Sequence, residues 1–381
     1  MPFGLTYKMG TEEMKFALLS GAYKNSGDYL IEQRAKSLLQ FVYPDSEILV
    51  CLRSEIMQRV DEINSCDAVV LAGGPIFMRN LEKYLPLDVC MDDITPPISV
   101  LGGGWYGTGG GNNQIYGYRF TKKTARFLHK IDEQGGILSV RDWMTYELLQ
   151  NQQFQNVVMT GCPAWYDPAY VHETELRSSG RIKKIVISDP ADKCYYSSCM
   201  ELVRFLRNKY ADAVLTFAFH RGISSDEKTQ KLLKELEQNE ASVVDLSGSA
   251  EGFSVYKDCG LHIGYRVHAH IYCLSLRYRS LLIEEDGRGA GVDQALGLFG
   301  IHAYNDLFHF SSPVLSRLYK RTPLFSNRNL AAQARCCLEK LDQAGDEYFH
   351  HAFAMQTVFY ENMISAIRSF GKEISISGGV R

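Results

Sequence analysis

Short apolar runs alternate with amphipathic stretches along most of this 381-residue chain, and no other feature constrains its fold as strongly. A short apolar run is typical of a buried strand, and apolar residues three to four apart are typical of a helix. Their alternation predicts a mostly parallel sheet with helices on both faces. In the first half we expect strands at 15–19, 47–52, 68–72, 98–101, 136–140 and 156–160, and helices at 28–41, 53–63, 121–134 and 143–150.

The alternation breaks once and then resumes. Residues 161–181 contain Pro163, Pro168 and a polar end at 178–180, which is typical of a linker. Beyond it we expect strands at 184–188, 213–217, 242–246, 261–263 and 280–283, and helices at 197–210, 226–238 and 267–276.

These patterns predict an α/β fold of two doubly wound, Rossmann-like domains that face each other across a cleft. We expect the first domain at residues 1–165, a linker at 166–181 and the second domain at 182–326. Residues 327–381 are predicted to be a helical tail that packs on the core or on a dimer partner. The sequence leaves the oligomeric state open.

Composition argues against several classes of partner. The net charge of −3 gives no reason to expect nucleic acid as a partner. The ten cysteines include no Cys-x-x-Cys pair, and Cys336 adjoins Cys337, so we expect reduced thiols rather than disulfides. No signal peptide and no apolar run of membrane-spanning length is recognisable. We therefore expect a cytoplasmic protein, which can also work peripherally at the inner face of the membrane.

The segment from Gly264 to His270 is the most informative motif. It follows a predicted strand and opens a predicted helix, where backbone N–H groups favour anions. Arg266 adds a guanidinium suited to phosphate or carboxylate, and His268 can transfer a proton near neutral pH. The alternative is a surface arginine and a structural histidine. No carboxylate or cysteine accompanies the histidines at a metal-ligand spacing, so no metal is expected.

Further candidates follow other predicted strands. Arg141 lies in Ser139-Val140-Arg141-Asp142, which binds a ligand or forms a structural corner. Asn25 and Asp28 lie in Asn25-Ser26-Gly27-Asp28, which contacts a substrate hydroxyl or caps a helix. The pair Gly73-Gly74 and the run 102–104, which includes Gly103, could let a ligand approach the backbone. Neither fits a dinucleotide-binding or Walker-type pattern. Residues 286–289 line the cleft or form a turn.

Together these motifs resemble the polysaccharide pyruvyltransferase family. The family's Arg-Leu-His-Ala turn appears as Arg266-Val267-His268-Ala269, and its Asn-x-Gly-Asp loop as residues 25–28. The strand with a Gly-Gly pair appears at residues 69–74, and the Arg-Asp corner at 139–142. The chain departs from the pattern at Cys162, where the family often has Asp. It also departs at residues 277–279, where Arg-Tyr-Arg replaces Gly-Val-Pro.

The resemblance implies a GT-B-like fold and pyruvyl transfer from phosphoenolpyruvate to a sugar or glycan acceptor, forming a cyclic ketal, with no cofactor. By analogy His268 and Arg266 are the catalytic residues, with His268 as the general acid, and Arg141, Arg266 and Val267 bind the donor. The cleft or the acceptor is assigned to Asn25, Asp28, Gly73, Gly74 and Gly103. Two alternatives remain open: a glycosyltransferase that uses a nucleotide sugar, and a non-catalytic sugar- or anion-binding protein. The acceptor sugar, and whether it is lipid-linked, also stay open.

Overall fold

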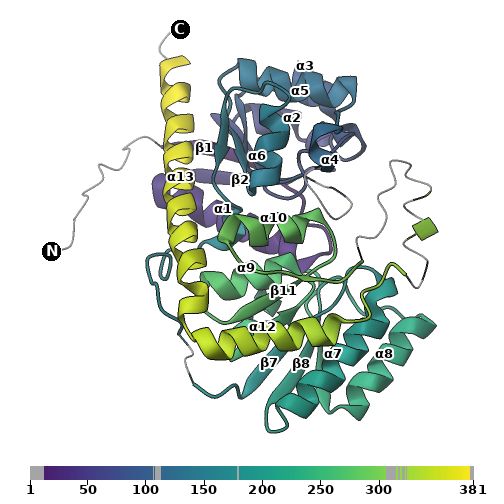
Figure 1. Cartoon of the computed structure of the whole chain (residues 1–381). Coiled ribbons are helices and arrows are strands. Elements are labelled where there is room, and N and C mark those ends of the chain that lie inside the picture. The colour runs from purple at the N-terminus through teal and green to yellow at the C-terminus, as the bar shows by residue number, and fades with distance from the viewer. Residues whose placement is uncertain are drawn as a thin grey trace, which may run out of the picture.

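Two parallel sheets of six strands each form the framework of the computed structural model (Figure 1). The structure describes residues 13–105, 107, 113–177, 180–305, 315, 318–319, 322 and 324–377. The first sheet has the order β2-β1-β3-β4-β5-β6. Its strands are β1 (Lys15–Ser20), β2 (Glu47–Leu52), β3 (Ala68–Ala72), β4 (Ile98–Gly103), β5 (Leu138–Val140) and β6 (Val157–Met159).

The second sheet has the order β12-β11-β10-β7-β8-β9. Its strands are β7 (Lys184–Ser188), β8 (Val214–Phe219), β9 (Ala241–Asp245), β10 (Leu261–Gly264), β11 (Ser280–Glu284) and β12 (Ile301–His302). The central strands are buried along their length because helices cover both faces of each sheet, which explains why they read as unbroken apolar runs.

Helices connect the strands of both sheets. In the first half they are α1 (Ser26–Val42), α2 (Val60–Asn64), α3 (Leu87–Asp92), α4 (Asn113–Tyr116), α5 (Lys122–Glu133) and α6 (Trp143–Gln150). In the second half they are α7 (Tyr196–Lys209), α8 (Glu227–Gln238), α9 (Val267–Ser275) and α10 (Gly287–Leu296). Several begin at a side chain that caps them: Thr121 accepts from Thr124 N–H, Asp142 from Thr145 N–H, and Asp226 from Thr229 N–H.

Two predicted features differ from the structure. The helix expected at 53–63 is a short 3₁₀ turn at Ile56–Gln58 followed by α2, because Arg53 continues the strand by donating its N–H to the Ser20 carbonyl. Residues 286–289 are not an isolated turn. Asp286 caps α10 by accepting the N–H of Arg288, although the three glycines of α10 disfavour a helix.

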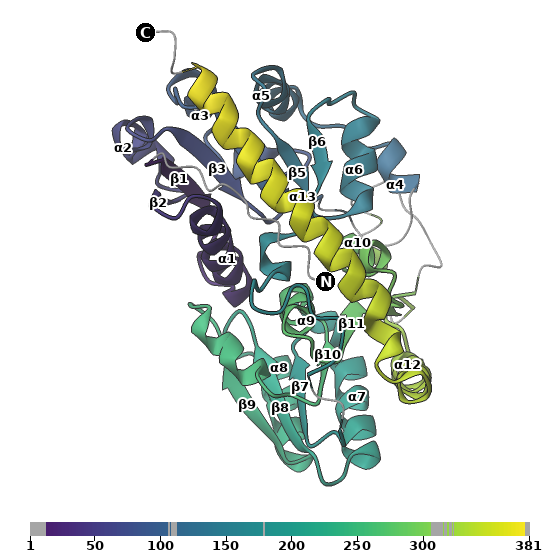
Figure 2. The same cartoon turned by 90° about the vertical axis from the view of Figure 1, so that its left-hand side faces the viewer.

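The C-terminal helices α12 (Leu330–Ala344) and α13 (Glu347–Ser377) connect the two halves. Helix α12 packs on α7, and α13 then runs from α10 of the second half to α1 and β6 of the first (Figure 2). The amide of Asn362 donates to the Met159 carbonyl, 3.0 Å away. Within the described residues no helix is both long and apolar enough to cross a membrane. All ten cysteines are free thiols.

Candidate active site

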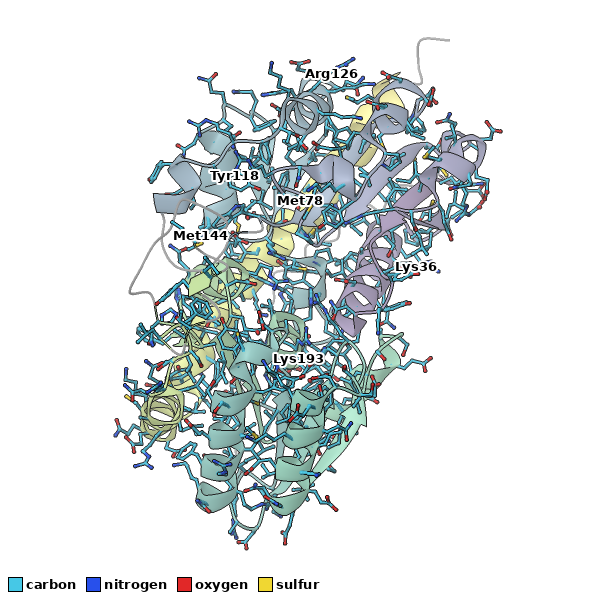
Figure 3. The ribbon with its side chains drawn as sticks, turned by 90° about the vertical axis from the view of Figure 1, so that its right-hand side faces the viewer. Lys36, Met78, Tyr118, Arg126, Met144 and Lys193 are labelled. Carbon is cyan, nitrogen blue, oxygen red and sulfur yellow. The ribbon has the colours of Figure 1, made fainter. Side chains whose placement is uncertain are left out.

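A cavity of about 880 Å³ lies between the two sheets. Residues that follow the carboxyl ends of strands from both sheets line it, which is where ligands bind in open α/β folds. Met78 lines it from the first half. In Figure 3, Met78 belongs to the upper half of the molecule and Lys193 to the lower half. Both halves build the cavity, and both contribute arginines, such as Arg141 from the first half and Arg266 from the second.

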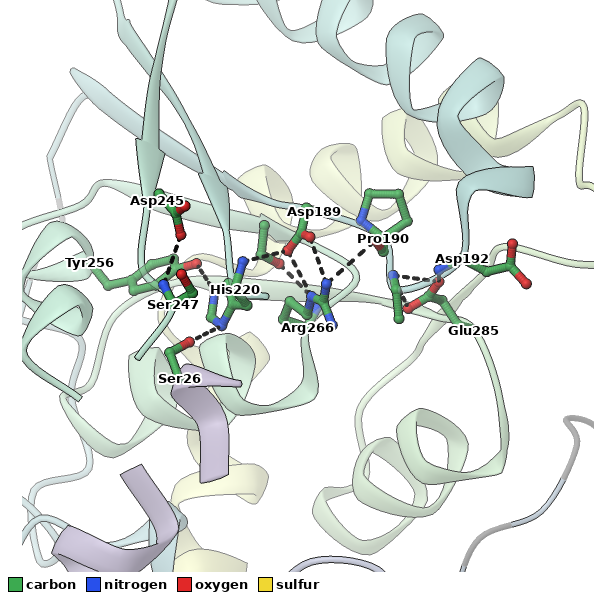
Figure 4. Close-up of polar contacts among 12 residues, drawn as sticks. Ser26, Asp189, Pro190, Asp192, His220, Asp245, Ser247, Tyr256, Arg266 and Glu285 are labelled. Carbon is green, nitrogen blue, oxygen red and sulfur yellow. Dashed lines mark hydrogen bonds and ion pairs between the residues drawn. The ribbon is translucent and has the colours of Figure 1, made fainter. Parts of the chain in front are cut away.

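Arg266 is held rigidly on the second-half wall. Its Nε and Nη2 donate to the two carboxylate oxygens of Asp189, at 2.7 and 2.6 Å (Figure 4). Burial opposes the charge of Arg266, but the neighbouring carboxylate outweighs it and raises the pKa of the guanidinium. Its backbone N–H donates to Ser188 Oγ at 3.0 Å, which fixes the start of α9. Two of the three guanidinium nitrogens thus face Asp189, a pairing across 77 residues of sequence.

His268 lies in the first turn of α9, half-buried, and lines the cavity. Burial lowers the pKa of its imidazole to about 3, assisted by the positive charges of four arginines: Arg141, Arg288, Arg266 and Arg221. The imidazole is therefore neutral in the unliganded protein at neutral pH. An anion bound among these arginines would offset their repulsion and raise the pKa of His268.

The arginines around His268 come from both halves. Arg141 follows β5, and its Nε lies 3.3 Å from Asp142 Oδ2. Arg288, in α10, binds Asp286 through Nε and Nη2 at 2.9 and 2.6 Å. Arg221 follows β8 and has neither a hydrogen bond nor an ion pair to a described residue. Such a cluster suits a small, multiply charged anion.

The structure brings most of the predicted residues to the cavity. Its wall includes Asn25, Asp28, Gly73, Gly74, Arg141, Arg266, Val267 and His268. Gly103 does not line it. That residue lies inside β4, where an added Cβ would come within 2.7 Å of Phe77 and Val100 side-chain atoms. Gly103 thus allows the side chains of Phe77 and Val100 to pack closely against its backbone.

Two histidines near His268 do not line the cavity. His262 and His270 are buried, and the Nδ1 atom of each lies 2.7 Å from Ser280 Oγ. They therefore stabilise the interior of the second half and do not join His268 at the site.

Several residues of the cavity wall were missed in the sequence, among them Arg53, Arg221 and Glu285. Burial raises the pKa of Glu285 to about 7, although Arg266 and the N–H groups of Ala191 and Asp192 oppose this shift. Arg53 and Glu285 directly follow β2 and β11, and Arg221 lies two residues beyond β8. That position is the signal that could have identified them.

The start of α1 reaches across to the second half. Ser26 donates its N–H to the His220 carbonyl at 3.1 Å, and its Oγ lies 2.8 Å from His220 Nδ1 (Figure 4). The next residue, Gly27, packs on His268: an added Cβ would lie 2.2 Å from Nδ1 and 2.9 Å from the Cβ of that side chain. Gly27 is needed for this contact rather than for a turn.

Replacing Gly27 by Ala should therefore displace the His268 ring. We expect a loss of roughly 100-fold in turnover, the effect of misplacing a reacting group by about 1 Å, and of about 1–3 kcal/mol in the free energy of unfolding. Steady-state kinetics and urea denaturation measure both. Gly117→Ala is the matched control, because an added Cβ there meets nothing within 4 Å. Full activity of Gly27→Ala would show that the imidazole tolerates this shift.

Comparison with known proteins supports the family suggested by the motifs. The family model described as polysaccharide pyruvyl transferase matches residues 25–287. This span contains Arg53, Arg141, Arg266 and His268. No curated protein matches the chain.

Solved structures show the fold. The chain is similar to a UDP co-structure of S. aureus MnaA, with 12% identity, 88% of this chain and 91% of that chain covered, and a TM-score of 0.55. It is also similar to a putative UDP-N-acetylglucosamine 2-epimerase from Listeria monocytogenes, with 12% identity, 91% and 94% covered, and a TM-score of 0.55. The corresponding epimerase from Neisseria meningitidis, bound to UDP-GlcNAc, has 9% identity, 93% and 99% covered, and a TM-score of 0.55.

These likenesses and the two six-stranded sheets confirm the predicted GT-B-like α/β fold. The family match covers more than half of the 381 residues. The chain therefore belongs to the polysaccharide pyruvyl transferase family and is a transferase.

Proposed function

We propose that the protein transfers a pyruvyl group from phosphoenolpyruvate to two hydroxyls of a sugar, which forms a cyclic ketal and releases phosphate. The observation that carries this proposal is the set of four arginines around the His268 imidazole in one cavity. Phosphoenolpyruvate is small and carries a phosphate and a carboxylate, both of which guanidinium groups bind well.

In this proposal the donor itself prepares His268 for catalysis. The negative charges of bound phosphoenolpyruvate offset those of the arginines, so the pKa of the imidazole rises and the ring takes up a proton. Protonated His268 then donates this proton to the methylene carbon of the donor while a sugar hydroxyl adds to the adjacent carbon. The second hydroxyl displaces phosphate from that carbon, and both hydroxyl protons leave to bases or water.

The arginines have different tasks in this scheme. Arg221, Arg288 and Arg141 bind the phosphate and carboxylate of the donor. Arg266 offers only Nη1 to the donor, because Nε and Nη2 bind Asp189. Val267 adds an apolar contact and a backbone N–H at the start of α9. Asn25, Asp28, Gly73 and Gly74 line the opposite wall, where the acceptor binds. The reaction takes place in the cytoplasm, at the inner face of the membrane if the acceptor is lipid-linked.

We expect the protein to release phosphate from phosphoenolpyruvate only when a sugar acceptor is present. Purified protein incubated with phosphoenolpyruvate and a panel of sugars and sugar phosphates should release phosphate and yield a product heavier by a pyruvate ketal in mass spectrometry. UDP-glucose and UDP-N-acetylglucosamine serve as competing donors. Transfer from a nucleotide sugar, with no binding of phosphoenolpyruvate, would overturn the proposal in favour of a glycosyltransferase.

A further inference from the structure

Arg53 in the first-half wall has no task in the reaction described above. It follows β2 directly, and its Nη2 donates to the carbonyls of Ala72 and Gly73 at 2.8 and 3.0 Å. Its backbone N–H donates to the Ser20 carbonyl at 2.9 Å. The guanidinium is thus fixed at the ends of the adjacent strands β1, β2 and β3, where it faces the cavity.

The charge of Arg53 lacks a direct counter-ion. No carboxylate of the described chain lies within ion-pair distance of it, and its Nε is buried without a hydrogen-bond partner. Burial lowers the pKa of Arg53 to about 10, and only the more distant charge of Asp28 opposes this shift. Burying an unpaired charge destabilises a fold, so such a group is a candidate for pairing with a bound anion.

The surroundings of Arg53 leave one edge of the guanidinium accessible. Gly21 and Gly74 flank Nη1: added Cβ atoms would lie 3.2 and 3.9 Å from it. Two tyrosines on the same wall, Tyr23 and Tyr84, are 82% and 61% exposed. Exposed aromatic faces with a polar tip suit a ligand that is partly apolar and partly hydroxylated, such as a sugar ring.

Asp28 lines the same cavity as Arg53. Burial raises the pKa of its carboxyl, and Asn25 and the charges of Arg221, Arg53 and Arg288 oppose this shift. Arg53 therefore belongs to the wall on which the proposed function places the acceptor, beyond the arginines that surround His268.

We propose that Arg53 is a second anion site of the cavity and that it selects acceptors which carry an oxyanion on the sugar or next to it. This inference rests on the proposed function, which assigns this wall of the cavity to the acceptor. The oxyanion can be the carboxylate of an acidic sugar or a phosphate ester, and Arg53 can bind either through Nη1, because Nη2 is bonded to backbone carbonyls and Nε is buried. A neutral sugar would leave the guanidinium unpaired.

The test compares three probes that share a ring and differ in charge: methyl glucuronide, glucose 1-phosphate and methyl glucoside. The donor site is first saturated with 2-phospholactate, which has the charged groups of phosphoenolpyruvate without its double bond. Isothermal titration should then show that at least one anionic probe binds at least about tenfold more tightly than the neutral one, as for a charge-assisted hydrogen bond. The anionic probe that binds more tightly shows whether the site prefers a carboxylate or a phosphate.

Variants assign that preference to Arg53. Arg53→Met should abolish it, whereas Arg59→Met should keep it, because Arg59 also donates to a backbone carbonyl but lies outside the cavity. Gly21→Leu covers Nη1 without touching the bonds of Nη2 and should abolish the preference even if Arg53→Met does not fold. Equal binding of all three probes to the natural protein, or an undiminished preference in Gly21→Leu, would overturn the proposal.

The outcomes for the two proposals are separable. Binding of 2-phospholactate is measured in the same titrations before any sugar is added. If 2-phospholactate does not bind while the Arg53-dependent preference for an anionic probe persists, the donor assignment is wrong. The proposal of a second anion site at Arg53 is then still supported. If 2-phospholactate binds and no probe shows the preference, the donor assignment stands and this inference is wrong.

Discussion

Replacing His268 by Ala should abolish pyruvyl transfer while the fold and the affinity for phosphoenolpyruvate are kept. A positioned general acid contributes roughly 10²–10⁴-fold to rate, and protonation at carbon offers no easy substitute. Phosphate release in a single turnover measures the loss. His350→Ala is the matched control, because His350 is an exposed histidine of α13 remote from the cavity.

The protonation of His268 provides an independent readout. The free protein holds the pKa of this imidazole at about 3, through burial and four arginines, so its ring signals at pH 7 should be those of the neutral form. Adding 2-phospholactate should shift them towards the protonated form. A ring that stays neutral with the donor site full would exclude His268 as the acid, even if His268→Ala were inactive.

Arg266→Ala should reduce the free energy of unfolding by about 3–5 kcal/mol, because it leaves the carboxylate of Asp189 buried without its partner. The affinity for the donor should fall as well, because the negative charge of Asp189 would then repel an anion in the cavity. Urea denaturation and titration with phosphoenolpyruvate measure the two effects. The pair of Arg204 and Glu235, in which the Arg204 side chain is 51% exposed, is the control: Arg204→Ala should cost less than about 1 kcal/mol.

A double variant separates the role of Arg266 in stability from its role in donor binding. Asp189→Asn with Arg266→Met removes both charges and keeps an acceptor for the His220 N–H. It should recover most of the stability while donor binding stays weak. Recovery of both would show that Arg266 only neutralises Asp189, and the donor would then depend on Arg141, Arg221 and Arg288.

The sequence predicted the strands well and the side-chain pairs poorly. Strand β3 is a continuous apolar run that Gly73 and Gly74 follow, a local signal that tertiary contacts do not override. The pairing of Arg266 with Asp189 is different, because it joins residues 77 positions apart, and only the sheet order places β7 beside β10.

The glycines show where local reasoning misleads. The sequence suggests that residues 25–28 contact a substrate hydroxyl or cap a helix, yet Gly27 lies inside α1, and its role depends on His268 from the other half. Gly103 was assigned to the cavity but packs within β4. A glycine signals that something approaches closely, and the sequence does not say whether that neighbour is a ligand or the protein itself.

The course of α13 has a consequence for how substrates enter and products leave. The helix is anchored to both halves, and none of its described residues lines the cavity. A rotation of one half against the other can therefore use α13 as its axis, with both sheets intact. Such a rotation would draw Gly27 away from His268. The imidazole would therefore be correctly positioned as the general acid only while the two halves are closed.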